Sequence, residues 1–123
     1  MNRSKKELGQ HGEDLAVEFL QRQCYKILER NFRNKLGEVD IIALDAGVIC
    51  FIEVKTRRTA LCGTPFEAIS RPKQFKLARL ALSYLKYKRL LERPARFDVM
   101  AVSPNAGEAE QVEIIKNAFD FPC

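Results

Sequence analysis

Two strand-like segments separated by a tight turn constrain the fold of this chain more than any other feature. Residues 38–44 and 48–55 are rich in β-branched and other apolar side chains, and Asp45-Ala46-Gly47 between them is typical of a hairpin turn. Both segments are apolar on both faces, except at the ends away from the turn. The pattern therefore predicts two central strands of a sheet that is covered on both sides.

The remaining segments predict helices packed on a mixed sheet. The expected elements, in chain order, are a helix over about residues 8–23, a strand over 25–32, the hairpin strands, a helix over about 72–91, a strand over 96–102 and an edge strand over 111–116. Ser70 is suited to cap the second helix, Pro72 to its first turn, and Pro94 to the segment beyond its end. The fold class is therefore α/β, with the order α-β-β-β-α-β-β. Since no repeat or linker interrupts the chain, residues 1–123 are expected to form a single domain.

Helical periodicity predicts which side of each helix faces the sheet. The expected inward stripe of the first helix consists of Glu13, Ala16, Val17, Leu20 and Cys24. The expected inward stripe of the second helix consists of Gln74, Phe75, Ala78, Ala81, Leu82 and Leu85. The basic residues expected on the other side of the second helix are Lys73, Lys76 and Arg79.

The charges are unevenly distributed along the chain. There are 21 Lys and Arg residues against 16 Asp and Glu residues, which gives a formal net charge of +5. Residues 71–96 hold nine basic residues and one acidic residue, whereas residues 36–70 hold three and five. A basic segment beside an acidic centre is typical of a metal-dependent enzyme that acts on nucleic acids. On charge alone, a solvated helix face explains the basic segment better.

The cysteine and histidine content excludes several kinds of site. The four cysteines, at positions 24, 50, 62 and 123, fit neither a zinc motif nor a short-loop disulfide framework, and His11 is the single histidine. We expect free thiols in a reducing cytosol, with Cys24 and Cys50 buried. Ser-His or Cys-His nucleophilic catalysis would have only His11 to draw on, and no elbow glycines surround any serine or cysteine, which argues against it. The absence of a glycine-rich phosphate loop argues against a nucleotide cofactor.

No segment of the sequence has the character of a membrane span or of a signal peptide. The longest uncharged stretch is too short and too polar to cross a bilayer, and no apolar core follows the charged N-terminus. We therefore expect a soluble cytoplasmic protein with no membrane partner.

The hairpin places acidic side chains close together. With a two-residue turn at Ala46-Gly47, Asp40 faces Glu53 and Glu38 faces Lys55 on one side of the sheet, with β-carbons about 5 Å apart. Two carboxylates in that position require solvent, a shared proton or a bound cation. A turn one residue longer would place the two carboxylates on opposite faces.

A bound cation is the alternative with chemical consequences. Two carboxylates and a nearby backbone carbonyl form a hard oxygen site suited to Mg²⁺ or Mn²⁺. Lys55 emerges on the face of Glu53, where it could orient an attacking water or neutralise a phosphoryl oxygen. A lone Glu-x-Lys is usually a surface salt bridge, but here it ends an apolar strand. The pattern therefore favours metal-assisted phosphodiester hydrolysis.

Two sequence stretches also resemble a known nuclease core. Gly37-Glu38-Val39-Asp40-Ile41-Ile42 and Phe51-Ile52-Glu53-Val54-Lys55-Thr56-Arg57 resemble the D…ExK core of the PD-(D/E)xK nuclease superfamily. Over roughly residues 9–116, the chain resembles the YraN-like family of small bacterial nuclease-like proteins. The supporting motifs are Gly9-x-x-Gly12-Glu13-x-x-Ala16, Asn31-x-Arg33-x-x-x-Gly37-Glu38, Lys73-Gln74 and Arg96-Phe97-Asp98-Val99. The resemblance implies a restriction-endonuclease-like fold, similar to that of the archaeal Holliday junction resolvases.

The same resemblance implies roles for individual residues. Asp40, Glu53 and the Val54 carbonyl correspond to the metal ligands and Lys55 to the catalytic lysine, while Glu13 and Gln74 correspond to helix residues at the site. Glu13 is explained nearly as well as an acid favoured by the dipole near a helix N-terminus. Gln74 is explained equally well by a hydrogen bond to the backbone. The chain departs from the resembled pattern by carrying Val39 in place of a proline and Cys24 in place of a turn glycine.

Basic residues near the expected site suggest contacts with nucleic acid. Arg57 and Arg58 follow the catalytic strand and could contact backbone phosphates, and Lys73, Lys76 and Arg79 could extend that footprint. Each of these residues is individually explained by a solvated surface. The resemblance implies DNA as the partner, including branched DNA, and a homodimer. The alternative is a non-catalytic nucleic-acid-binding or complex-assembly module that retains the nuclease fold.

Overall fold

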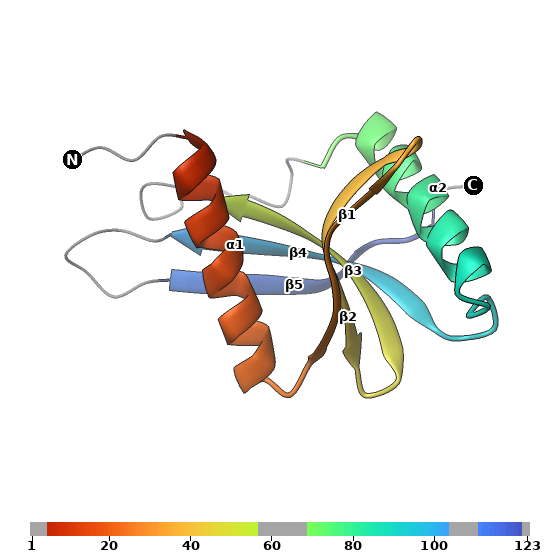
Figure 1. The fold of residues 1–123 in the computed structure, drawn as a ribbon, viewed down its shortest axis with the longest axis horizontal. Coiled ribbons are helices and arrows are strands. Elements are labelled where there is room, and N and C mark those ends of the chain that lie inside the picture. Colours follow the sequence, from red (N-terminus) through yellow and green to blue (C-terminus); the bar gives the residue numbers. More distant parts are fainter. Residues whose placement is uncertain (1–4, 57–68, 104–110, 122–123) are drawn as a thin grey trace.

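The computed structural model describes residues 5–56, 69–103 and 111–121 (Figure 1). The elements are α1 (Lys5–Arg22), β1 (Lys26–Asn34), β2 (Gly37–Asp45), β3 (Val48–Thr56), α2 (Arg71–Tyr87), β4 (Ala95–Ser103) and β5 (Gln111–Phe119). This order confirms the predicted α-β-β-β-α-β-β arrangement.

The five strands form one mixed sheet in the order β1-β2-β3-β4-β5. Neighbouring strands are antiparallel except β3 and β4, which run parallel and are connected through α2. Helix α1 packs on one face of the sheet and α2 on the other (Figure 1). The hairpin strands β2 and β3 are therefore internal strands covered on both sides, as their apolar sequences predict.

The turn between β2 and β3 has the predicted length. Ala46 and Gly47 both have positive φ angles, 48° and 88°, as a two-residue hairpin turn of type I′ requires. The pairing runs from Asp45 with Val48 to Ile41 with Ile52, which is the predicted register. Glycine at the second turn position adopts this backbone without strain.

Helix α1 confirms most of its predicted stripe. Glu13, Ala16 and Leu20 are buried, and Val17 is buried with them. The prediction for Cys24 is wrong, because α1 ends at Arg22 and Cys24 lies exposed in the following turn with φ at 67°. This left-handed position after a helix end usually belongs to glycine. Cys50 is buried as predicted; both are free thiols, and Cys62 and Cys123 lie outside the described residues.

Helix α2 is shorter than predicted and turned about its axis. The Ser70 hydroxyl accepts the Lys73 N–H at 3.3 Å, as expected of a cap, but the helix ends at Tyr87 rather than near residue 91. Phe75 and Leu82, predicted to face inward, are 39% and 49% exposed. The buried face contains Leu77, Ala78, Leu80, Ala81, Tyr84 and Leu85.

The rotation of α2 follows from an aromatic contact. Leucines occur on several sides of this helix, so apolar periodicity alone does not fix its orientation. The Tyr84 ring packs edge-on against Phe32 and Phe51, with ring centroids 5.2 and 5.8 Å apart. This contact turns Leu80 toward the sheet and Leu82 toward solvent. In the part of the chain that the structure describes, no helix is both long and apolar enough to span a membrane.

A pair of leucine substitutions tests the orientation of α2. Leu80→Ala should lower the free energy of unfolding by about 2–5 kcal/mol, because Leu80 is 1% exposed and its loss leaves a cavity. Leu82→Ala, the matched control two positions further along, should cost less than about 1 kcal/mol. Urea unfolding followed by circular dichroism measures both values. Equal losses would contradict the observed orientation.

Candidate active site

The β2–β3 hairpin opens where its acidic side chains begin. Within the described strands, the pairing stops at Ile41 and Ile52, so the predicted opposition of Asp40 to Glu53 and of Glu38 to Lys55 does not occur as ladder pairs. Beyond this point β3 pairs with β4 alone, and β2 with β1 alone. Repulsion between two directly opposed carboxylates disfavours continued pairing.

The Asp40 carboxylate takes over a backbone hydrogen bond at the opening. Its Oδ2 accepts the Val54 N–H at 2.7 Å, in place of a carbonyl of the neighbouring strand. The side chain thereby satisfies a buried donor while the two strands separate. The strands have the predicted register as far as Ile41 and Ile52. Beyond these residues, the hydrogen bond between Asp40 and Val54 replaces strand pairing, and the length of the turn does not predict this bond.

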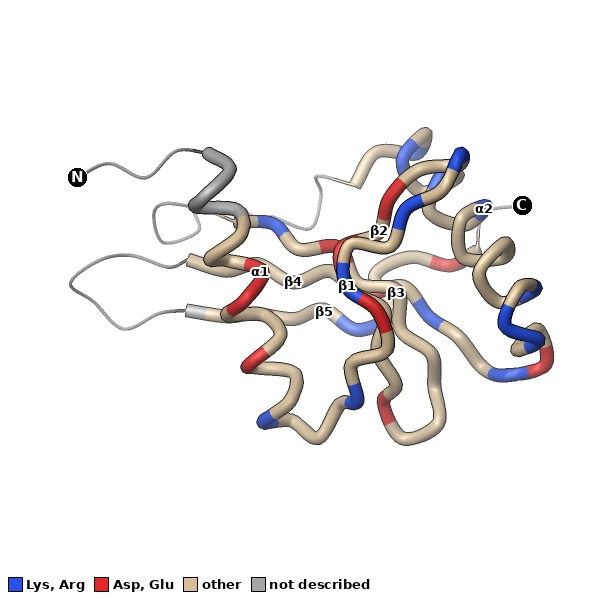
Figure 2. Tube along the Cα trace, in the orientation of Figure 1, with Lys and Arg blue, Asp and Glu red and all other residues tan. Residues whose placement is uncertain are grey.

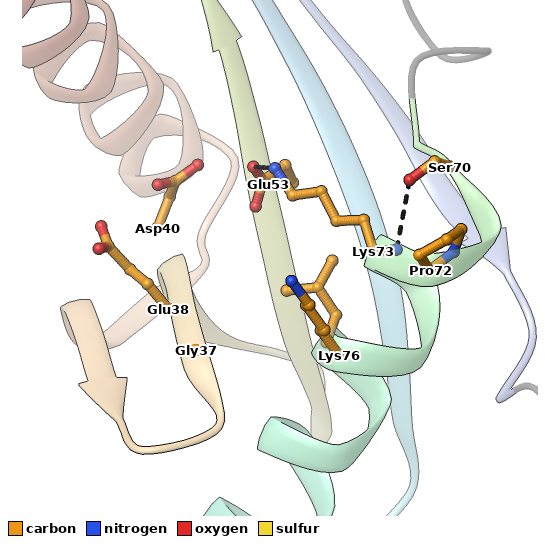
Figure 3. A pocket seen from close by; sticks show the side chains of 9 residues that line it. Gly37, Glu38, Asp40, Glu53, Ser70, Pro72, Lys73 and Lys76 are labelled. Atoms are coloured by element: carbon orange, nitrogen blue, oxygen red, sulfur yellow. Dashed lines mark hydrogen bonds and ion pairs between the residues drawn. The ribbon is translucent and has the colours of Figure 1, made fainter.

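A cavity with a volume of about 470 Å³ lies at this opening, between the hairpin and the start of α2 (Figure 3). One wall is acidic and comes from β2 and β3, and the other is basic and comes from the first turns of α2. The lining residues are Gly37, Glu38, Asp40, Glu53, Ser70, Pro72, Lys73, Lys76 and Leu77. The fold thus brings together two of the three predicted acids, Asp40 and Glu53, with two of the predicted phosphate-binding lysines.

Asp40 is the acid most affected by this environment. Burial, followed by the negative charge of Glu53, raises the pKa of Asp40 to about 7. The Val54 hydrogen bond and the charge of Lys73 lower the pKa, while Glu13 contributes a smaller increase. Asp40 therefore titrates near neutral pH in the protein without a bound cation.

Glu53 has a positively charged partner. It is 8% exposed, and Lys73 Nζ donates to its Oε1 at 2.6 Å (Figure 3). Burial lowers the pKa of Lys73, but the hydrogen bond and the charge of Glu53 outweigh it and raise that pKa above its usual value. Lys73 is therefore an ammonium ion at all physiological pH values, and it neutralises one acid of the pair.

Glu13 approaches the site from the α1 side of the sheet. Its Oε1 accepts hydrogen bonds from Arg30 Nε and Nη2, at 3.3 and 3.2 Å, and from Asn31 Nδ2 at 2.9 Å. A Cβ added to Gly12 would overlap Oγ1 of Thr56, so α1 lies directly against the end of β3. Glu13 is not among the described residues that line the cavity, yet its charge reaches Asp40.

The remaining predicted side chains that the structure describes, those of Lys55, Gln74 and Arg79, are not among the residues that line the cavity. Lys55 lies on β3 two residues after Glu53, on the same face of the strand, and is paired in the ladder with Ala101 of β4. Gln74 donates from Nε2 to the Ile69 carbonyl at 3.1 Å, which is the backbone-bonded alternative. Arg79 is exposed on α2 outside the cavity lining, and Arg57 and Arg58 lie outside the described residues.

Three contacts at the site were missed by sequence reasoning. Helical periodicity predicts Lys73 on the outer side of its helix, whereas its side chain reaches back to Glu53. Arg30 and Asn31, which hold Glu13, were not assigned a role at the site. Asn31 has a φ of 52°, a left-handed conformation that asparagine tolerates better than most residues. An asparagine inside a predicted strand is therefore the sequence signal that could have pointed to an irregular backbone at this position.

The cavity has carboxylates on one wall and ammonium groups on the other. Among the described residues, no three His, Cys, Asp or Glu side chains are grouped so as to hold a metal ion. The carboxylates that line the cavity are those of Glu38, Asp40 and Glu53, and carboxylate oxygens are ligands of the kind that hard divalent cations prefer. Lys73 and Lys76 provide ammonium groups for an anion such as a phosphate.

Comparison with known proteins places the chain among close relatives. Residues 12–102 match the family model described as Uncharacterised protein family UPF0102. A UPF0102 protein of Geotalea uraniireducens is 48% identical over 116 residues, covering 94% of this chain and 91% of the relative. A UPF0102 protein of Caldicellulosiruptor saccharolyticus is 49% identical over 117 residues, covering 94% of this chain and 99% of the relative.

A solved structure, Pyrococcus furiosus SfsA in complex with Ca²⁺, is similar at 15% identity and a TM-score of 0.40. The similarity covers 92% of this chain and 62% of the SfsA chain. With a TM-score below 0.5, this likeness carries no weight for the fold or the function.

Removal of the Asp40 charge should make stability less dependent on pH. Between about pH 4 and pH 7 the folded protein keeps a proton on Asp40 that the unfolded chain has released, so raising the pH across this window lowers wild-type stability. Asp40→Asn retains an acceptor for the Val54 N–H and lacks the titration. The variant should therefore gain roughly 2–4 kcal/mol relative to wild type between pH 4 and pH 8. Urea unfolding in EDTA at both pH values measures this gain, and a constant difference would contradict the raised pKa.

Gly12→Ala tests the approach of α1 to β3. In an open helix position this change stabilises by up to about 1 kcal/mol. Here the new methyl group would overlap Oγ1 of Thr56 and lie 3.2 Å from its Cβ, so we expect lower stability. The double variant Gly12→Ala/Thr56→Ala should recover much of the loss, which thermal unfolding of both variants can establish. A single variant more stable than wild type would show that the contact is absent.

Proposed function

The chain belongs to the UPF0102 family, and we propose that it is a metal-dependent nuclease that hydrolyses DNA phosphodiester bonds. The observation that carries this proposal is the pairing of Asp40 and Glu53 in one cavity. Burial and the charge of Glu53 raise the pKa of Asp40 to about 7, so ionising both acids together is unfavourable unless a cation joins them. Lys73 compensates the charge of Glu53, whereas the raised pKa of Asp40 indicates that the Asp40 charge is not fully compensated by neighbouring groups.

The donor set fits Mg²⁺ or Mn²⁺. The carboxylates of Asp40 and Glu53 and the carbonyl of Val54 would hold the cation, with water completing its coordination. When bound, such an ion lowers the pKa of a coordinated water and neutralises charge on a phosphoryl oxygen. Asp40 accepts the Val54 N–H through Oδ2. Its second carboxylate oxygen, Oδ1, could therefore bind the cation while this hydrogen bond is kept.

The protein side chains would do the rest of the chemistry. Lys55, next to Glu53 on the same strand face, would orient the attacking water or stabilise the negative charge that develops on the phosphoryl group. Glu13 would assist through its negative charge near Asp40. Gln74 would act as a positioning residue, because its bond to Ile69 fixes the first turn of α2 that carries Lys73.

DNA is the proposed substrate because basic residues line the cavity and lie on the elements that form it. Figure 2 shows Lys and Arg residues on the β1–β2 hairpin and along α2, on either side of the acids. Lys76 lines the cavity. Arg71 and Arg79 are exposed on α2, and Lys35 is exposed in the turn between β1 and β2. With Arg57 and Arg58 added, these cations would bind the phosphates that flank the scissile bond. Branched DNA as substrate, a homodimer as the active form and a cytoplasmic location complete the proposal.

One observation favours a second candidate function. The ammonium of Lys73 already neutralises Glu53 at 2.6 Å, and Glu13 is held by Arg30 and Asn31. A site neutralised by its own side chains could serve a nucleic-acid-binding or complex-assembly module that does not cleave. Turnover separates the two functions.

A cleavage assay tests the proposal. Linear, flapped and four-way-junction DNA would be incubated with Mg²⁺ or Mn²⁺, with Glu53→Ala as the contamination control. Lys55→Ala should reduce the cleavage rate at least about 100-fold while the melting temperature changes little, because Lys55 acts on the reacting groups. Glu92→Gln, an exposed acid outside the cavity, should cleave like wild type. Undiminished cleavage by Lys55→Ala would overturn the mechanism, and DNA binding without cleavage of any substrate would favour the module.

A further inference from the structure

We infer that Lys73 is a built-in counter-ion of the acidic pair, and that a DNA phosphate releases it so that the divalent cation and DNA bind cooperatively. This inference rests on the proposed function. It adds a role for a residue that the nuclease core motif does not include, and it predicts how cation and substrate depend on each other.

The first observation is the position of the ammonium group. Lys73 Nζ lies 2.6 Å from Oε1 of Glu53, and the Glu53 side chain is only 10% exposed. In Figure 3 the Lys73 side chain extends from α2 across the cavity toward Glu53, which comes from β3. An ammonium group in this place provides the positive charge that a bound cation would provide.

Lys73 and a divalent cation cannot both occupy this place without repulsion. A cation bound to Glu53 would share a carboxylate with the ammonium and would lie only a few ångströms from Nζ, in surroundings where solvent screens charges weakly. The ammonium group of Lys73 already lies 2.6 Å from Oε1 of Glu53, so the two positive charges would compete for the same carboxylate oxygen. Binding of the cation therefore requires the Lys73 side chain to move or the cation to bind weakly.

The structure allows the side chain to move while the backbone stays. The Lys73 N–H is fixed by Ser70, and Gln74 is fixed by Ile69, so the helix start is held from two sides. The Lys73 side chain itself is 38% exposed and borders the cavity. Rotation of its flexible methylene chain would move Nζ away from Glu53 without disturbing α2.

A displaced Lys73 would create a site for an anion. Lys76 lies one turn further along α2 and lines the same cavity, so the two ammonium groups would be neighbours. The first turn of the described helix α2 contains no acidic residue that could pair with them. A backbone phosphate of DNA is the anion that the proposed function brings to this place.

The two binding events are therefore coupled. Phosphate binding would stabilise the displaced lysine and leave Glu53 free for the cation, and cation binding would release the lysine for phosphate. Thermodynamic linkage requires both effects to have the same magnitude. The protein would bind its metal weakly in the absence of DNA and tightly in its presence.

Titration calorimetry with Mn²⁺ at pH 8 tests this inference without measuring cleavage. Lys73→Gln should bind Mn²⁺ roughly tenfold more tightly than wild type, because the competing charge is gone. Lys73→Arg, which keeps the ion pair, should bind like wild type. Lys76→Gln is the matched control, because it removes a charge from the same cavity but not the partner of Glu53, and its affinity should change less than about threefold. Lys73→Met repeats the test if the Gln variant does not fold by circular dichroism.

A second arm measures the coupling with DNA. In a Lys55→Ala background, which should prevent hydrolysis and leave both acids in place, a short DNA duplex should raise the Mn²⁺ affinity roughly tenfold. Adding Lys73→Gln should remove most of this gain. A duplex that raises the affinity equally in both backgrounds would contradict the release of Lys73.

Glu53→Gln separates the two proposals. If Glu53→Gln binds Mn²⁺ as well as wild type, or if neither wild type nor Lys73→Gln binds it, the metal site and the proposed function both fail. If Glu53→Gln loses Mn²⁺ binding while Lys73→Gln has the wild-type affinity, the metal site stands and the counter-ion role of Lys73 fails.

Discussion

The candidate site depends on one hydrogen bond, from the Val54 N–H to Oδ2 of Asp40. The two-residue turn fixes the register of β2 and β3, and continued pairing would force Asp40 and Glu53 directly against each other. The carboxylate instead accepts the donor that the neighbouring strand would have bonded. The strands then separate without leaving a buried backbone group unpaired, and the space between them becomes the cavity.

A second aspartate in the sheet also accepts a backbone N–H from a neighbouring strand, but its charge is neutralised by an arginine. Asp98 on β4 accepts the Asn117 N–H at 2.8 Å, at the register shift between β4 and β5. There Arg96 donates from Nε to both Asp98 oxygens, at 3.0 and 3.2 Å, and from Nη2 to Asp45 at 2.8 Å. That buried acid is neutralised within the fold, whereas Asp40 has a raised pKa. In the proposed function, this contrast assigns Asp98 to the structure of the sheet and Asp40 to the binding of a cation.

Sequence reasoning reached the elements whose causes are local. The hairpin turn, its register, the element order and the burial of Glu13 follow from periodicity and turn chemistry, and all four are observed. The orientation of α2 follows instead from a contact of Tyr84 with strands distant in sequence, which no helical pattern contains. The partner of Glu53 was missed for the same reason, because the rotation of α2 decides where Lys73 points.

The topology explains why lysines meet acids at this place. Since β3 and β4 are parallel and α2 connects them, α2 begins near the carboxyl end of β3, beside Glu53. Lysines in the first turns of a helix are opposed by the helix dipole, which favours acids there. Lys73 and Lys76 are tolerated because Glu38, Asp40 and Glu53 supply negative charge from the opposite wall. Each wall therefore compensates the other, and a cation and a phosphate that enter together would preserve that balance.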